Sequence, residues 1–201
     1  RELAGRLHGP DQKAALDELG ALHANLAAAL DWFEERDEME VGLRMVADLT
    51  WYWYLSGRYR SGRRRAQRWL DRCETGALRA GALLVIGMMT VFLGEWRRGA
   101  AVLGQAAAEA AAAGAPAVNA LARSYQAVFT RWLGETAEGW RLQEEGLREA
   151  RSTGDRPLLV HALILAYCTS GGDFPDDGFP GESPFSGLEE ARRIAIELDY
   201  S

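Results

Sequence analysis

Three glycines return at nearly even spacing, and each separates an apolar-periodic stretch from a more polar one. They are Gly57, Gly94 and Gly134, at intervals of 37 and 40 residues. A period of this size, with a helix on each side of a short turn, is typical of an α-solenoid, in which helical pairs bury their apolar stripes by stacking. The spacing therefore predicts an all-α fold, a right-handed superhelix of antiparallel helical pairs, as a single domain over residues 1–201.

Apolar residues recur every three or four positions between these glycines, which predicts the helices themselves. Gly9, Pro10 and Asp11 form a typical helix start, with a proline tolerated in the first turn and an acidic residue at the positive end. A segment rich in glycine and proline, residues 170–186, predicts a long loop before the last helix. The expected helices span residues 11–33, 38–55, 59–73, 78–93, 96–113, 116–133, 136–152, 157–168 and 187–198.

Composition excludes several classes of protein. The formal net charge is −6, which disfavours nucleic-acid binding by bulk electrostatics. No apolar run approaches the roughly 18 residues of a membrane span, and no secretory signal is visible at the start. Cys73 and Cys168 form no CxxC motif, and we expect both to be reduced in a cytoplasmic protein. The chain begins without methionine, and we expect it to be a piece of a longer protein.

No constellation of residues indicates catalysis or metal binding. His8, His23 and His161 are isolated and belong to no HExxH motif. Serine and cysteine nucleophiles lack a recognisable base partner, and the carboxylate pairs lie on polar helix faces. We therefore expect no enzyme activity, no cofactor and no metal.

The aromatic run at residues 51–54 points around its helix, so it cannot lie entirely in the core. Matching the repeats by their distance from the turn glycines places three residues of each unit on the concave side. An aromatic and apolar groove edged by both charge signs suits a peptide, a helix or an apolar small molecule. The alternative is that these residues pack against the preceding helix. The candidates for this groove are Trp51, Tyr54, Arg58, Met88, Val91, Glu95, Val128, Arg131 and Glu135.

A cluster of arginines over residues 58–72 is the strongest charge feature. One hypothesis is a basic patch that contacts an acidic partner, a neighbouring domain or a phosphate group. The alternative is a solvated helix face whose arginines pair with acidic helices or lie over aromatic rings. No DNA-recognition motif accompanies the cluster. The candidate patch is Arg60, Arg63, Arg64, Arg65 and Arg68, flanked by Arg58 and Arg72.

The repeats resemble tetratricopeptide (TPR) units. That family places Leu-Gly at the turn, small residues along the second helix and a proline near the end of a unit. The residues that carry this resemblance are Leu93-Gly94 and Leu133-Gly134 at the turns, Ala106, Ala110, Ala113, Gly146 and Ala150 along second helices, and Pro116 and Pro157 near unit ends.

A second resemblance covers roughly residues 7–72. The stretches 7–12, 16–19, 23–32, 51–57 and 62–64 are similar to the segment that joins the ATPase module to the TPR array in bacterial STAND-class transcription regulators of the SARP and LuxR types. In that family the ATPase and DNA-binding domains lie elsewhere in the chain. The resemblance implies that the array receives a signal or holds the ATPase module inactive. The Gly-rich phosphate loop of the ATPase is absent from these 201 residues.

These observations predict a non-enzymatic module for protein interaction and signal sensing in a cytoplasmic bacterial transcriptional regulator. Its expected partner is a protein or peptide, including the ATPase module of its own full-length chain, or a small-molecule effector. We expect neither direct nucleic-acid binding by this segment nor a membrane partner. The alternative is a stand-alone TPR adaptor that binds a peptide or self-associates, unrelated to transcription.

Overall fold

The computed structural model describes residues 2–73, 76–168 and 186–199, and this part of the chain is helical without any strand. The all-α expectation is confirmed. The helices are α1 (Glu2–Gly5), the 3-10 helix η1 (Arg6–His8), α2 (Gln12–Ala21), α3 (His23–Glu35), α4 (Met39–Asp48), α5 (Thr50–Leu55), α6 (Tyr59–Leu70), α7 (Ala77–Phe92), α8 (Trp96–Ala112), α9 (Pro116–Trp132), α10 (Thr136–Thr153), α11 (Arg156–Cys168) and α12 (Ser186–Glu197).

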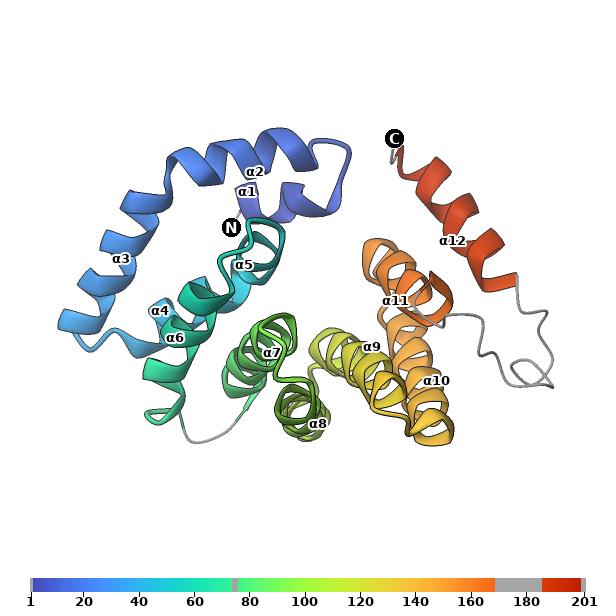
Figure 1. Cartoon of the computed structure of the whole chain (residues 1–201). Helices are drawn as coiled ribbons and strands as arrows, with labels where there is room; N and C mark the ends of the chain where they lie inside the picture. The colour runs from blue at the N-terminus through green and yellow to red at the C-terminus, as the bar shows by residue number, and fades with distance from the viewer. Residues whose placement is uncertain (1, 74–75, 169–185, 200–201) are drawn as a thin grey trace.

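Successive helices pack on one another as the repeat pattern predicts. The pairs α7/α8, α9/α10 and α11/α12 each pack together, and α8 and α10 in turn pack against the helix that opens the next pair. In Figure 1 the helices follow an arc, with α1 and α5 on its inner side, facing α11. The chain is therefore a helical-repeat solenoid whose first helix in each pair lies toward the inside of the arc.

The three regularly spaced glycines occupy the turns. Gly57, Gly94 and Gly134 have φ angles of +68°, +87° and +88°, the left-handed conformation that glycine adopts without a steric penalty. At the second turn, the N–H of Gly94 donates to the carbonyl of Val91 at 3.0 Å. This bond satisfies a carbonyl group that the end of α7 would otherwise leave unpaired. The glycine spacing in the sequence is thus the spacing of the turns.

Two of the expected helices are each divided in two. The stretch 11–33 breaks at Leu22 into α2 and α3, and the stretch 38–55 breaks at Leu49 into α4 and α5. The hydroxyl of Thr50 donates to the carbonyl of Ala47 at 2.6 Å beside the second break. Neither break contains glycine or proline, so apolar periodicity alone predicted continuous helices. The second break places Trp51 in the first turn of α5.

Small residues allow close contacts between helices. A Cβ atom on Gly42 of α4 would lie 1.7 Å from the ring of Trp69 on α6, and one on Gly99 of α8 would lie 2.3 Å from Val91 on α7. Each of these two units also has the reverse arrangement, with Gly62 of α6 against Trp53 of α5 and Gly87 of α7 against Leu103 of α8.

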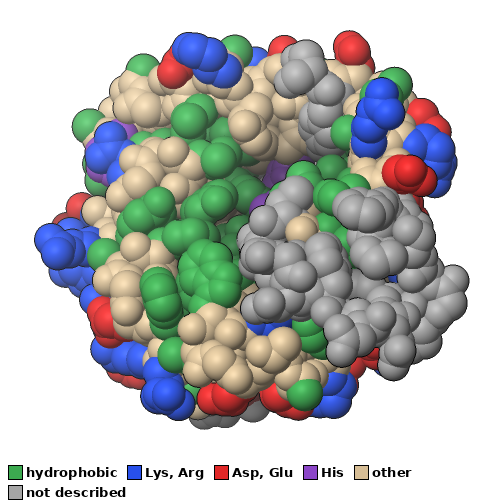
Figure 2. Space-filling view, turned by 45° about the vertical axis from the view of Figure 1, so that its right-hand side comes forward, with side chains coloured by type: hydrophobic (Ala, Val, Ile, Leu, Met, Phe, Trp, Pro, Cys, Tyr) green, Lys and Arg blue, Asp and Glu red, His purple; other side chains and the backbone are tan. Residues whose placement is uncertain are grey.

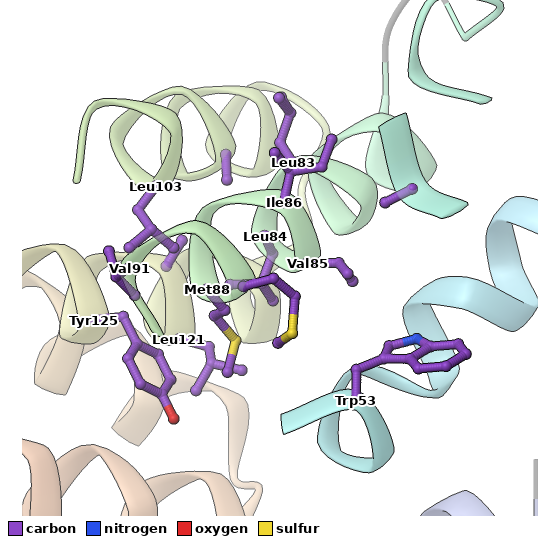
Figure 3. Packing of buried hydrophobic residues seen from close by; sticks show 14 of the residues in the cluster. Trp53, Leu83, Leu84, Val85, Ile86, Met88, Val91, Leu103, Leu121 and Tyr125 are labelled. Atoms are coloured by element: carbon purple, nitrogen blue, oxygen red, sulfur yellow. The ribbon is translucent and has the colours of Figure 1, made fainter. Parts of the chain in front are cut away.

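The largest hydrophobic cluster lies in the middle of the arc and includes residues of α7, α8 and α9. Figure 3 shows apolar side chains of α7, among them Leu84 and Met88, next to Leu121 and Tyr125 of α9. A second cluster joins α9 and α10 to α11 and α12, with Tyr167 among its members. The two clusters pack the inner helices against one another along the arc.

The predicted loop at 170–186 lies outside the described residues, except for Ser186, which begins α12. The last helix packs on α11 and so completes the last pair.

Candidate ligand-binding cavity

A cavity of about 500 Å³ lies on the inner side of the solenoid. This volume is within the range of small-molecule sites. Figure 2 shows apolar side chains gathered around a hollow on this face, with histidine atoms visible inside it. Its lining residues come from the N-terminal segment, from α4, α5, α7, α9 and α11, and from Asp155 just before α11: Ala4, Gly5, His8, Ala47, Asp48, Thr50, Trp51, Leu84, Ala117, Val118, Leu121, Asp155, Pro157, Leu158 and His161.

Four apolar residues of the lining recur at the repeat period. Ala47, Leu84, Leu121 and Leu158 follow one another at intervals of 37 residues, on α4, α7, α9 and α11. Each successive helical pair therefore contributes one apolar side chain to the wall. The cavity is a product of the repeat architecture, because stacking brings these four positions to the same inner surface.

Trp51 joins the two ends of the solenoid across the cavity. Its ring centroid lies 5.0 Å from that of His8 on η1 and 4.4 Å from that of His161 on α11, both in edge-to-face geometry. Such contacts are favourable for aromatic rings. The first and last helical pairs are therefore in direct contact on the inner side, although more than 100 residues separate Trp51 from His161.

His161 also forms a polar pair with Tyr125. Its Nε2 atom lies 3.0 Å from the Tyr125 hydroxyl. Burial lowers the pKa of His161 to about 3, and the nearby His8 adds to this effect. Burial also raises the pKa of the Tyr125 phenol well above its ordinary value. Both groups are therefore neutral at physiological pH and are held as a hydrogen-bonded pair.

Carboxylates lie at two places on the cavity lining. Asp155 precedes α11, and its Oδ1 accepts a hydrogen bond from the backbone N–H of Leu158 at 3.0 Å. Burial lowers the pKa of His8, while the negative charge of Asp155 opposes this shift. Asp48, the last residue of α4, also belongs to the lining. Among the described residues that line the cavity, none is lysine or arginine.

Of the nine residues predicted to line a concave groove, Trp51 alone lines this cavity. Met88, Val91 and Val128 are 0%, 1% and 2% exposed, so they belong to the core and cannot form an open surface. The prediction is wrong for these three because their side chains pack into the hydrophobic core. Phe92 of α7 is among the partly buried residues that pack against the same cluster.

The other five lie outside the cavity, and most of them contact neighbouring side chains. Tyr54 packs on Phe92, with ring centroids 4.7 Å apart, and Arg131 lies over the ring of Trp140 at 4.4 Å. Glu95 and Glu135 form ion pairs with arginines, and Arg58 lies close enough to His23 to lower the pKa of that histidine, after the larger effect of burial.

The arginine cluster on α6 is largely paired with acidic side chains. Three of its members bind acidic residues on or just after α3, and a fourth reaches the turn between α7 and α8. The pairs are Arg65 with Asp31, Arg68 with Glu34 at 2.9 Å, Arg72 with Asp37 at 2.9 Å, and Arg63 with Glu95 at 2.5 Å. Within the described part of the chain, Arg60 and Arg64 form no ion pair. The cluster therefore ties α6 to its neighbours, as the alternative interpretation holds.

Sequence reasoning missed His8 and His161 because they are isolated in the sequence. The 37-residue register of Ala47, Leu84 and Leu121 was the signal that could have located the cavity. The turn-based matching instead selected the last turns of the inner helices, whereas the cavity lies beside their earlier turns.

Comparison with known proteins adds no assignment to this geometry. No protein-family model matches the chain, and none of the curated proteins matches it. Over the residues that the structure describes, no cluster of histidine, cysteine or acidic side chains has the composition to hold a metal ion. No described helix combines the length and apolarity needed to cross a bilayer. The fold and cavity define a helical-repeat scaffold with a ligand-sized site on its inner side.

Proposed function

We propose that this chain is the signal-receiving, non-enzymatic module of a cytoplasmic bacterial transcriptional regulator, and that its inner cavity is the ligand site. One observation carries the proposal: the cavity is shared by the first and last helical pairs, which meet at Trp51 and His161. A ligand seated there contacts both ends of the solenoid at once.

Such a ligand has a direct route to regulation. A molecule that binds one curvature of the solenoid more tightly than another shifts the population toward that curvature. The coupling free energy available to a neighbouring domain is limited by this difference in affinity. Because η1 and α11 face one another across the cavity, closing or widening it changes the distance between the two ends of the array.

The cavity is tested most simply with a neutral apolar probe. N-phenyl-1-naphthylamine gains fluorescence in apolar surroundings and fits within about 500 Å³. We expect saturable binding of one probe per chain. Ala117→Trp, at an exposed position on the lining, fills the cavity and abolishes binding, whereas Ala111→Trp, an exposed position on α8 away from the cavity, leaves it unchanged. Equal binding by both variants contradicts the proposal.

The regulatory context rests on the resemblance of residues 7–72 to the linker segment of STAND-class regulators, and it has its own test. The reading frame that contains this chain is expected to encode an upstream phosphate loop of the form GxxxxGK[ST] and a DNA-binding domain. A reading frame without these domains supports a stand-alone adaptor instead.

A further inference from the structure

We propose that the cavity binds a neutral, largely apolar molecule through one carbonyl oxygen, which accepts a hydrogen bond from the imidazole of His161. This inference rests on the proposed function, because it assumes that the cavity is a ligand site. It adds the chemical class of the ligand. It follows from a hydrogen-bond donor on the lining that the described part of the chain leaves without an acceptor.

The hydrogen bond between Tyr125 and His161 determines which nitrogen of the imidazole carries the proton. The Tyr125 hydroxyl lies 3.0 Å from Nε2 of His161, and within the described structure it makes no other hydrogen bond. Tyr125 is 1% exposed, so a hydroxyl proton directed elsewhere would be buried without an acceptor, which is costly. The hydroxyl therefore donates to Nε2, and the proton of the neutral imidazole is on Nδ1.

The Nδ1–H group of His161 is the unused donor. The lowered pKa of His161, about 3, keeps the imidazole neutral at pH 7, so the ring carries a single N–H. None of the described residues accepts a hydrogen bond from this N–H. His161 lines the cavity, and histidine atoms are visible inside the hollow in Figure 2. An oxygen atom of a bound molecule is therefore a suitable acceptor for it.

The other polar side chains of the lining ask less of a ligand. Thr50 donates to the carbonyl of Ala47 at 2.6 Å, and Asp48 has an interaction of its own. Asp155 is exposed to solvent and accepts the N–H of Leu158.

His8 is the exception among these side chains. It is half-buried and forms no hydrogen bond within the described residues, and its ring contacts Trp51 as the ring of His161 does. Its neutral imidazole adds a second N–H to the lining beside the Trp51 ring.

A carbonyl oxygen matches these donors. It has two lone pairs and no proton of its own, so it accepts from one or two N–H groups. A carboxylate would accept as well, but moving its charge into apolar surroundings is costly, and neutral imidazoles provide no compensating cation. The aliphatic side chains of Leu84, Leu121 and Leu158 suit the apolar remainder of the molecule.

Three probes with one naphthalene body separate the effect of the oxygen from that of shape. 2-Acetylnaphthalene carries a carbonyl, 2-isopropenylnaphthalene has a CH₂ group in place of the oxygen, and 2-naphthoate is an anion. Equilibrium dialysis against the whole chain measures the three affinities. We expect the ketone to bind more tightly than the anion, because only the anion loses the hydration of a full charge.

The decisive quantity is the ratio of ketone affinity to hydrocarbon affinity, compared between the wild type and His161→Phe. Differences in the hydration of the free probes cancel in this comparison. Phenylalanine keeps an aromatic ring beside Trp51 and removes the N–H. We expect the ratio to fall about tenfold, as the loss of one hydrogen bond to a buried donor provides. Retained binding of 2-isopropenylnaphthalene shows that the cavity of the variant is intact.

His23→Phe is the matched control. His23 is likewise bonded to a tyrosine, Tyr52, at 3.0 Å, but it is not part of the cavity lining. We expect the ratio of the two affinities to stay at its wild-type value in this variant. A tenfold fall in His23→Phe as well would overturn the assignment to His161.

A measurement on the wild type does not depend on any variant. Two-bond ¹H–¹⁵N spectra of the chain labelled with ¹⁵N-histidine distinguish a protonated ring nitrogen from an unprotonated one. We expect Nδ1 of His161 to be protonated and Nε2 to be unprotonated. We also expect 2-acetylnaphthalene to shift the Nδ1 resonance more than 2-isopropenylnaphthalene does. A proton on Nε2, or equal shifts with the two probes, would overturn the inference.

The outcomes distinguish this inference from the proposed function. An equal ratio in the wild type and His161→Phe, with both probes lost in Ala117→Trp, keeps the cavity as a site and overturns recognition of the carbonyl. It would show that the face of the Trp51 ring already accepts the N–H. Tighter binding of 2-naphthoate than of the ketone overturns the preference for a neutral molecule. If neither neutral probe binds, the inference is wrong, and the naphthylamine probe still decides independently whether the cavity is a binding site.

Discussion

Replacement of His161 is expected to change how the stability of the fold depends on pH. The pKa of this imidazole is about 3 in the folded chain, against an ordinary value of 6.5. The folded state therefore resists protonation while the unfolded state accepts it. Below pH 6.5 the unfolded state binds more protons, so the free energy of unfolding falls as pH falls.

The size of the effect follows from these two values. Between pH 7 and pH 5, a group with a pKa of 6.5 in the unfolded state and about 3 in the folded state contributes a loss of about 2 kcal/mol. Water that enters the cavity would solvate the imidazolium, so this figure is an upper limit. Other titrating groups add their own pH dependence, but they are common to the wild type and the variant and cancel in the difference.

His161→Gln isolates this contribution, because glutamine keeps a polar group near the Tyr125 hydroxyl but does not titrate. Urea unfolding followed by circular dichroism at pH 7 and pH 5 measures the two free energies. We expect the wild type to lose up to about 2 kcal/mol more than the variant. His23→Gln is the control: His23 is also bonded to a tyrosine, Tyr52, at 3.0 Å, and its substitution should reduce the pH dependence less. Identical pH dependence in the wild type and His161→Gln would refute the reasoning.

Three further predictions concern the packing of the solenoid, each measured by urea unfolding. Gly99→Ala places a Cβ atom 2.3 Å from the Val91 side chain and 2.9 Å from the Val91 backbone nitrogen, and this clash should destabilise the fold by about 2 kcal/mol. The control, Gly20→Ala, has open space around the new Cβ atom and should stabilise the fold by about 0.5 kcal/mol. A stable Gly99→Ala variant would contradict the close helix contact. Gly134→Ala, at a φ of +88°, should cost about 1–2 kcal/mol, and no loss there would mean that the turn is not left-handed. Arg65→Ala removes an ion pair and a well-covered side chain, and it should lower the free energy of unfolding by about 1 kcal/mol. The control, Arg60→Ala, should leave the free energy of unfolding nearly unchanged. Equal effects of the two substitutions would show that the pairing of α3 with α6 contributes nothing.

The repeat architecture was predictable because it depends on local signals. The turn glycines and the apolar periodicity around them set the helical pairs, and Gly57, Gly94 and Gly134 occupy the turns they predict. The breaks at Leu22 and Leu49 were not predictable in this way, since both residues favour helices and tertiary packing decides their conformation.

The site was harder to predict, because it depends on contacts between distant parts of the chain. Repeat matching placed Trp51 on the concave side, where it lines the cavity, but it could not show that the array curves until Trp51 meets His161. It also treated Met88 and Val128 as surface residues, although an inward-pointing side chain becomes core wherever adjacent repeats cover it. The degree of curvature, and hence which inner positions remain open, is a sum of small rotations between repeats that no single sequence motif encodes.

The contact between the two ends of the solenoid is the basis of both the cavity and its proposed function. Nuclear Overhauser spectroscopy on the isotopically labelled chain tests it directly, through the ring protons of Trp51 and His161. With centroids 4.4 Å apart, we predict cross-peaks between the indole and imidazole protons. Their absence, with both rings assigned, would show that the ends do not meet and that the cavity does not exist in the form described.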